Sequence, residues 1–139
     1  MTTAAPSVQM SAGISGLTVQ LQHGPSTTRL TTVPPTDNGG TGDSFSPTDL
    51  VGAALVSCAL TTMALGAARE GLAWGDASGT VSKQMTPPPR RIAALTVVLQ
   101  MPAEVRPEQR PRLEELARTC PVARSLHPEV RLPMEFRYP

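Results

Sequence analysis

The stretch FSPTDLVGAALVSCALTTMALGAAREG, residues 45–71, decides how the rest of the chain is interpreted. Ser46 is suited to cap the N-terminus of a helix, Pro47 suits the first helical position, and Asp49 places a negative charge in the first turn, where the helix dipole favours it. After these residues the stretch is apolar or small until its last turn. We therefore predict a long helix from Pro47 to about Gly71 that is buried on most sides and forms the centre of the fold.

The spacing of side chains along this helix indicates how it packs. One series recurs at steps of three and four residues, which places its members on neighbouring turns of one side. Most of the remaining positions are glycine or alanine, and such small residues let other backbones approach closely. The series consists of Leu50, Ala54, Leu55, Cys58, Thr62 and Leu65.

Two extended runs precede the helix. Residues 8–22 alternate apolar and polar side chains at Leu17, Val19 and Leu21, which is typical of a strand. The turn residues HGPS follow, and then residues 27–33 form a second run rich in threonine. We predict that the two runs form a β-hairpin.

The segments on either side of this hairpin have the composition of irregular structure. Residues 1–7 are interpreted as a loose tail. The segment PPTDNGGTGDS, residues 34–44, is rich in turn-forming residues and lacks the Lys-Ser/Thr pair of a phosphate-binding loop. We interpret it as a polar loop that serves as a flexible lid or linker.

After the helix, strands and helices follow without a regular βα alternation. Residues 79–85 and 90–102 predict two strands, separated by a TPPP segment whose prolines exclude a sheet interior. Residues 106–120 predict an amphipathic helix, and a proline directly after Cys120 starts another short helix with that cysteine as its N-cap. Residues 129–138 predict a last strand. This order of elements favours the α+β class.

The composition limits the function classes. A length of 139 residues fits one domain, residues 1–139. The 12 basic and 11 acidic residues nearly cancel, which argues against nucleic acid or a membrane as partner. Aromatic residues make up only 3%, so we expect a thin core that a second copy of the chain completes. The first residues lack the features of a signal peptide, and we expect a cytoplasmic protein.

The chain has two cysteines, Cys58 and Cys120. Cys58 lies about three turns inside the predicted helix, too far for the helix dipole to activate its thiol, so packing and nucleophilic roles both stay open. Cys120 is better placed, because N–H groups at a helix N-terminus stabilise a thiolate. Two cysteines cannot form a closed zinc site from thiolates alone. We interpret His23 and His127 as surface residues, with a role of His127 in tuning Cys120 as the alternative.

Two motifs carry a resemblance to a known family. FSPTDLVGAALVSC joins a Pro-X-acid-Leu helix start to Cys58 in a small-residue helix, and CPVARSL places Cys120 before Pro-Val, ahead of the last strand. In this order and spacing the chain resembles the OsmC/Ohr superfamily, the osmotically inducible and organic hydroperoxide resistance proteins, over about residues 13–138. The resemblance implies an OsmC-like fold and an intertwined homodimer in which each long helix is buried against the sheets of both subunits.

The resemblance also implies a chemistry at the dimer interface that needs no cofactor and no metal. Cys58 is expected to attack a peroxide and Cys120 to resolve the product. A thiolate breaks the O–O bond to give a sulfenic acid and an alcohol, a second thiol condenses with the sulfenic acid to a disulfide, and an external dithiol reduces that disulfide. Burial in an apolar helix favours organic hydroperoxides over H₂O₂, because it offers contact area to an alkyl tail.

The chain departs from the family pattern at one position. The hydroperoxide reductases that it resembles have a glutamate directly after the helix-starting proline, paired with an arginine that holds the thiolate. Here that position is Thr48, which can hydrogen bond but cannot pair ionically, and Asp49 is turned about 100° further around the helix. Arg29 is our candidate for the thiolate partner. Arg90 and Arg91, which strand alternation sends to opposite faces, are rivals or serve to protect an exposed edge.

Two further functions stay open. A non-catalytic OsmC-like module could have kept an apolar ligand site at the dimer interface while losing the Glu–Arg pair. A hydrolase-like use of Cys58 with His127 lacks any sequence feature for the oxyanion site that acyl transfer requires. The reactivity of Cys58 separates the first alternative from a peroxidase, because a peroxidatic thiol is alkylated quickly near neutral pH and a buried relic resists.

Overall fold

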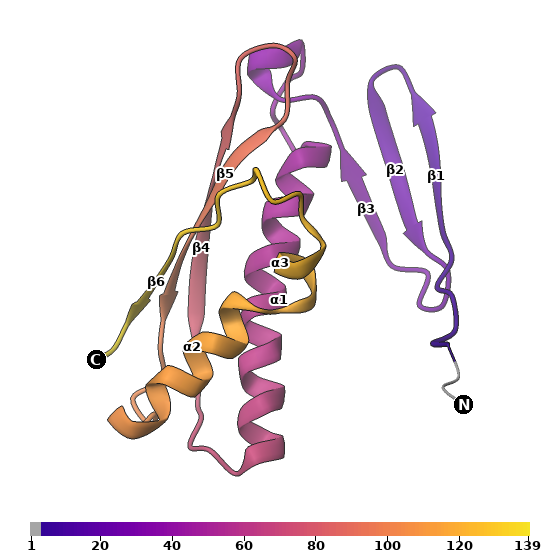
Figure 1. Ribbon diagram of the computed structural model, residues 1–139. Helices are drawn as coiled ribbons and strands as arrows, with labels where there is room; N and C mark the ends of the chain where they lie inside the picture. Colours follow the sequence, from indigo (N-terminus) through magenta and orange to yellow (C-terminus); the bar gives the residue numbers. More distant parts are fainter. Residues whose placement is uncertain (1–3) are drawn as a thin grey trace. The chain divides into compact units, whose positions relative to one another are not determined.

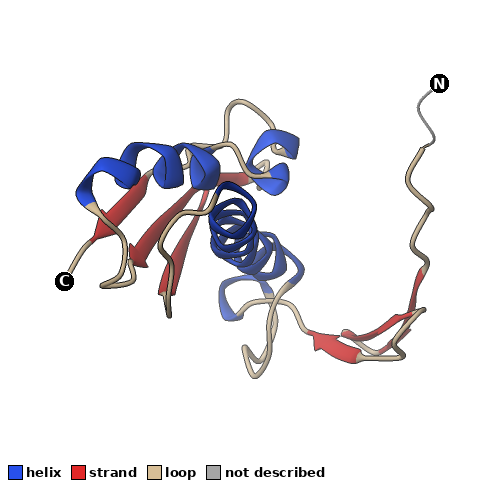
Figure 2. Ribbon diagram, turned by 90° about the horizontal axis from the view of Figure 1, so that it is seen from below, coloured by secondary structure: helices blue, strands red, loops and turns tan. Residues whose placement is uncertain are grey.

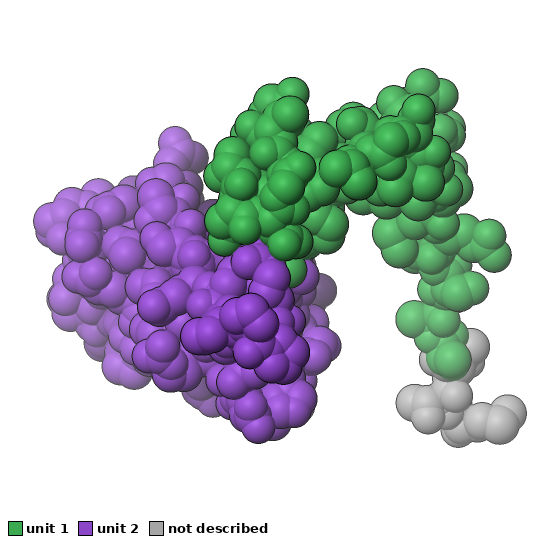
Figure 3. All heavy atoms as spheres, turned by 90° about the horizontal axis from the view of Figure 1, so that it is seen from above, with its two compact units in different colours: residues 1–50 green, residues 51–139 purple. Residues whose placement is uncertain are grey.

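The computed structural model describes residues 4–139, and its strands and helices confirm the predicted α+β class (Figure 1). The chain divides into two compact units (Figure 3), residues 1–50, called here the N-terminal unit, and residues 51–139, called the C-terminal unit. A single domain over the whole chain stays a prediction. The predicted tail, residues 1–7, lies partly outside the described residues, and its described part forms no helix or strand.

The N-terminal unit holds a three-stranded antiparallel sheet of β1 (Met10–Ser15), β2 (Thr18–His23) and β3 (Arg29–Thr32), in that order. It contains one strand more than the two predicted runs, because the first run folds back on itself at Gly16 and Leu17. Gly16 has a φ of 61°, a conformation that glycine adopts without strain. Leu17 therefore lies in a turn rather than in a strand.

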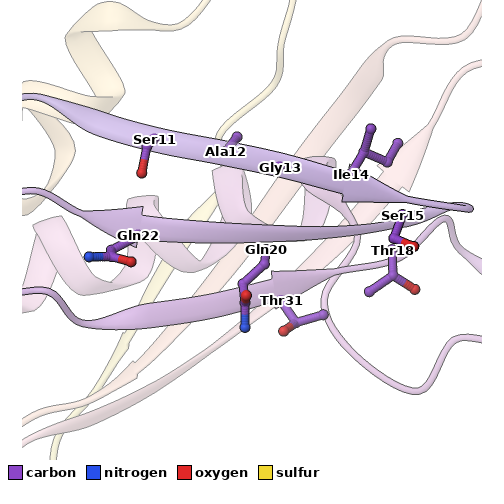
Figure 4. Close-up of a pocket in the computed structure, with 9 residues that line it drawn as sticks. All are labelled: Ser11, Ala12, Gly13, Ile14, Ser15, Thr18, Gln20, Gln22 and Thr31. Carbon is purple, nitrogen blue, oxygen red and sulfur yellow. The ribbon is translucent and has the colours of Figure 1, made fainter.

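The two faces of this sheet differ in chemistry. Residues directly opposite each other on paired strands share a face, as Ile14 and Val19 do on one side and Gln20 and Thr31 on the other. Figure 4 shows the side chains of Gln20, Gln22 and Thr31 on one side of the strands and that of Ile14 on the other. We call the second side the apolar face; it consists mainly of Met10, Ala12, Ile14, Val19, Leu21 and Leu30.

The long helix begins where the sequence predicts. The loop of residues 34–44 contains one short 3-10 turn, η1 (Thr36–Asn38), and α1 (Pro47–Glu70) follows. The hydroxyl of Ser46 accepts the N–H of Asp49 at 3.1 Å, and the carboxylate of Asp49 accepts the N–H of Ser46 at 2.8 Å. This reciprocal cap satisfies two backbone donors and confirms the predicted helix start.

The buried side of α1 differs from the predicted series. Leu55 is the only member of that series with no exposed surface, whereas Ala54 and Leu65 are exposed. Small residues decide the packing, because a Cβ at Gly66 would lie 2.4 Å from a methyl carbon of Leu116. The buried residues are Gly52, Leu55, Ala59, Met63, Gly66 and Ala67. The opposite side, called here the exposed stripe, consists of Ala54, Ser57, Thr61, Leu65 and Ala68.

By length and composition alone, α1 could cross a membrane. The central helix of a soluble protein meets the same criteria. The buried side of α1 packs in the hydrophobic core of the C-terminal unit, as such a helix does.

The C-terminal unit is a three-stranded sheet with helices packed on one face (Figure 2). β4 (Ser78–Met85) and β5 (Ile92–Gln100) are antiparallel, and β6 (Met134–Arg137) runs parallel to β5. The turn η2 (Pro107–Gln109) leads into α2 (Arg110–Arg118), and α3 (Pro121–Ser125) follows. The largest fully buried core residues are Leu55, Met63, Leu95, Val97, Leu99 and Leu113.

Two boundaries in this unit correct the prediction. β5 begins at Ile92, so Arg90 and Arg91 precede the strand and strand alternation does not assign them to opposite faces. The last strand is shorter than residues 129–138, although the carbonyl of Arg131 already accepts the N–H of Leu95 at 2.9 Å. A proline at position 133 has no N–H to donate, which limits regular pairing before β6.

Candidate active site

The C-terminal unit brings Cys58 and Cys120 together. Cys58 lies in the middle of α1, and Cys120 is the N-cap residue of α3, as the proline after it predicted. Both are free thiols, and their side chains lie close enough together for Cys58 to influence the proton on Cys120. The fold therefore brings the two thiols near each other, as a redox-cycling pair requires. The sequence alone left open whether they would meet.

Burial separates the two thiols. Cys120 is fully buried in the core, whereas Cys58 packs against that core and keeps part of its surface exposed. Burial raises the pKa of the Cys120 thiol, and contact with Cys58 raises it further. The N–H groups of Ala123 and Val122, at the start of α3, act in the opposite direction.

The balance of these effects corrects one expectation. The N-terminus of α3 favours the Cys120 thiolate, as predicted, but desolvation outweighs it and keeps the proton on the sulfur. Sequence reasoning could identify the helix start but not the depth at which Cys120 is buried. Cys58 is consequently the partly exposed thiol of the two, and Cys120 is the buried, protonated one.

A hydroxyl group completes the surroundings of Cys58. The Sγ atom of Cys58 lies 3.8 Å from the Oγ1 atom of Thr62, one helical turn further along α1. Residues four positions apart on a helix face the same side, so this contact follows from the local geometry. Sequence reasoning assigned Thr62 only to a packing series and missed the contact of its hydroxyl with Cys58. The spacing of four residues on a helix could have predicted that contact.

Thr48 belongs to the cap of α1. Its hydroxyl lies 3.3 Å from the hydroxyl of Ser46, beside the reciprocal cap that Ser46 forms with Asp49. Asp49 thus acts at the helix N-terminus, as predicted. A catalytic role of Thr48 stays a prediction.

The arginine candidates have partners at the surface. Arg29 lies on the polar side of the N-terminal sheet, where its Nε donates to the side-chain oxygen of Gln22 at 3.3 Å. Arg91 forms an ion pair with Glu129 at 3.2 Å and also donates to a backbone carbonyl. Arg90 is exposed and lies just before β5. Which of these arginines, if any, holds the thiolate stays a prediction.

The histidines lie at the surface, as predicted. His23 hydrogen bonds with Ser26 in its turn, and the ring of His127 accepts the N–H of Glu129 at 3.1 Å. Among residues 4–139, no three His, Cys, Asp or Glu side chains gather into a group that could hold a metal ion.

Comparison with known proteins places this site in a family. Residues 40–135 match the family model described as OsmC-like protein. The chain belongs to the OsmC-like family. A comparison with curated protein sequences gave no significant match.

Solved structures of OsmC-like proteins are similar over nearly the whole chain. A protein of Psychrobacter arcticus 273-4, named for osmotic stress induction and a detoxification response, is 28% identical with a TM-score of 0.87, over 96% of this chain and 98% of that one. An organic hydroperoxide resistance protein of Legionella pneumophila is 17% identical with a TM-score of 0.79, at the same coverage. Another from Elizabethkingia anophelis is 15% identical with a TM-score of 0.81, over 99% and 100% of the two chains. These similarities establish the OsmC-like fold.

Proposed function

We propose that this OsmC-like protein is a thiol peroxidase that reduces organic hydroperoxides to alcohols, with Cys58 as the peroxidatic and Cys120 as the resolving cysteine. The contact between the two thiols is the observation that carries this proposal. Structural neighbours named for organic hydroperoxide resistance add support at the level of the fold.

The reaction has three balanced steps. The Cys58 thiolate attacks the terminal oxygen of the hydroperoxide, the O–O bond breaks, and the departing alkoxide takes up a proton to become the alcohol. The Cys120 sulfur then displaces hydroxide from the Cys58 sulfenic acid, which forms a disulfide and, with the Cys120 proton, water. An external dithiol is oxidised as it returns both cysteines to thiols.

The difference in burial supports this division of roles. The partly exposed Cys58 can be reached by a substrate, whereas the fully buried Cys120 is shielded from it and already touches the sulfur that it has to attack. Most side chains around the two sulfurs are apolar, including Val122 and Ala123. Such surroundings favour the alkyl group of an organic hydroperoxide over H₂O₂.

We further propose that the active form is a homodimer. The apolar face of the N-terminal sheet leaves Met10 71% and Ile14 68% exposed. The exposed stripe of α1 carries no charged residue, although a helix face in contact with water usually does. A second copy that covers these surfaces would bury apolar area and enclose the entrance to Cys58.

Arg29 and Thr48 remain our candidates for polar contacts to the substrate or the thiolate. The Arg29 side chain is exposed and held by a neutral glutamine, so it can exchange that partner for an anion. We also propose that the protein acts in the cytoplasm, where both thiols stay reduced between turnovers.

A short pulse of cumene hydroperoxide on the reduced protein, followed by thiol blocking and mass spectrometry, tests the proposal. We expect a disulfide between Cys58 and Cys120 after an equimolar pulse, and none when the thiols are blocked beforehand. Two free thiols after prolonged exposure would overturn the proposal and favour a non-catalytic module that binds an apolar ligand.

A further inference from the structure

The longest uncharged part of α1 surrounds the reactive cysteine. Between Asp49 in the first turn and Arg69 in the last, α1 contains no charged residue. A thiolate at Cys58 therefore has no cationic side chain on its own helix within two turns. On α1, only hydrogen-bond donors can stabilise such a thiolate.

Two donors contact the Cys58 sulfur. One is the Cys120 thiol, which burial keeps protonated and which is the titratable group that faces Cys58 from α3. The other is the hydroxyl of Thr62, with an oxygen–sulfur distance of 3.8 Å. A thiol is a weak donor and a hydroxyl a stronger one, so Thr62 is the better donor of the two.

We propose that the Thr62 hydroxyl donates a hydrogen bond to the Cys58 thiolate and sets the fraction of reactive sulfur near neutral pH. This inference rests on the proposed function, because it concerns the same sulfur. A donor to a charged acceptor stabilises the charged form over the neutral thiol, which can accept the same bond only weakly.

A competing role for Thr62 is purely structural. Threonine inside a helix often donates to the carbonyl four residues earlier, which here belongs to Cys58. In that role the hydroxyl would affect helix stability and leave the titration of the thiol unchanged. The test therefore measures the pH dependence of the Cys58 reaction, which a purely structural role would leave unchanged.

The test follows the reaction of Cys58 with a small aromatic disulfide, 4,4′-dithiodipyridine, across pH in a Cys120→Ala background, which removes the second thiol without adding a hydroxyl donor. We expect Thr62→Val, which removes the hydroxyl at nearly constant shape, to raise the half-maximal pH of the reaction by about one unit. Because a more basic thiolate is also more nucleophilic, the plateau rate should rise about threefold while the rate at low pH falls about threefold. The two profiles should therefore cross.

Matched variants control for packing. Thr62→Ser keeps the hydroxyl and should follow the parent profile, and so should Thr96→Val, which makes the same chemical change at an exposed position of β5. If Thr62→Val does not fold, Thr62→Ala should give the same crossing profile. A Thr62→Val or Thr62→Ala profile that coincides with the parent, or a Thr62→Ser profile shifted as far as theirs, would overturn the inference.

The test of Thr62 can fail or succeed independently of the test of the peroxidase proposal. Formation of the Cys58–Cys120 disulfide by cumene hydroperoxide is measured in the chain with both cysteines. Disulfide formation together with unchanged pH profiles would refute only the role of Thr62. Crossing profiles without disulfide formation would support that role and refute the peroxidase.

Discussion

The two units of the chain differ in how far their apolar side chains are buried. In the C-terminal unit, large core residues such as Leu55, Met63 and Leu99 have no exposed surface, and the helices cover one whole face of the sheet. In the N-terminal unit, Met10 and Ile14 are 71% and 68% exposed on the apolar face. The N-terminal unit thus leaves an apolar sheet face exposed, whereas the C-terminal unit has its own core and holds both thiols.

Under our proposal, this contrast separates the site of the chemistry from a surface used in assembly. A dithiol needs fixed geometry, which a closed core of packed side chains supplies. A bare apolar sheet face is costly in water unless something covers it, and in our proposal a second copy does so. Substitutions in the core of the C-terminal unit should therefore affect catalysis or folding, and substitutions on the apolar face of the N-terminal sheet should affect assembly.

The largest effect is expected at the cysteines of the C-terminal unit. Cys58→Ser should reduce consumption of cumene hydroperoxide to the background rate. The other thiol, Cys120, is buried and not accessible to the peroxide. Cys120→Ser should still consume one equivalent and accumulate a sulfenic acid that dimedone traps. The measurement is peroxide remaining against time, with mass spectrometry of the dimedone adduct. Undiminished turnover in Cys58→Ser would show that Cys58 is not the peroxidatic thiol.

The next largest effect is expected on the free energy of unfolding, when a large side chain is shortened to alanine. The same change in each unit compares the two units directly. Leu99→Ala should lower the free energy of unfolding by about 2–5 kcal/mol, because it leaves a cavity at a fully buried position. Leu17→Ala, at a turn residue that is 62% exposed, should change it by less than about 0.5 kcal/mol. Urea titrations followed by circular dichroism measure both. Equal losses would mean that Leu17 is buried in the assembled protein.

A charge on the apolar face tests assembly. Ile14→Glu should raise the dissociation constant of the homodimer at least about 100-fold, because the interface would bury an unpaired carboxylate. Thr18→Glu adds the same charge to the opposite face and should leave the constant nearly unchanged. Sedimentation equilibrium of both variants gives the values. A monomeric parent protein, or equal effects of the two charges, would contradict the proposed role of the apolar face.

Local chemistry made parts of this fold predictable from the sequence. Ser46, Pro47 and Asp49 define the start of α1 through interactions within four residues, and the proline after Cys120 likewise defines the start of α3. The buried side of α1 was not predictable in the same way. The helix is apolar or small all round, so periodicity could not distinguish the buried side from the exposed side that carries Leu65.

The candidate site could not be predicted from the spacing of residues along the sequence alone. The family resemblance brought Cys58 and Cys120 together as an expectation, and the fold places them in contact. The depth at which Cys120 is buried could not be inferred, and so the direction in which its pKa shifts was predicted incompletely. The contact of Thr62 with Cys58 was within reach, because it requires only a helix and a spacing of four residues.

The smallest expected effect concerns an exposed ion pair that joins α1 to α2 within the better-packed unit. The Arg112 guanidinium donates to both carboxylate oxygens of Glu70, from Nε at 2.9 and 3.1 Å and from Nη2 at 2.7 Å, and this lowers the pKa of the Glu70 carboxyl. A lowered pKa in the folded state adds stability at neutral pH that is lost as the pH falls through the folded-state pKa. Glu70→Gln should therefore be slightly less stable than the parent at neutral pH and equally stable in acid, by urea titration. Because both side chains are exposed, high salt should shrink the difference, and a difference unaffected by salt or pH would mean that Glu70 acts through packing instead.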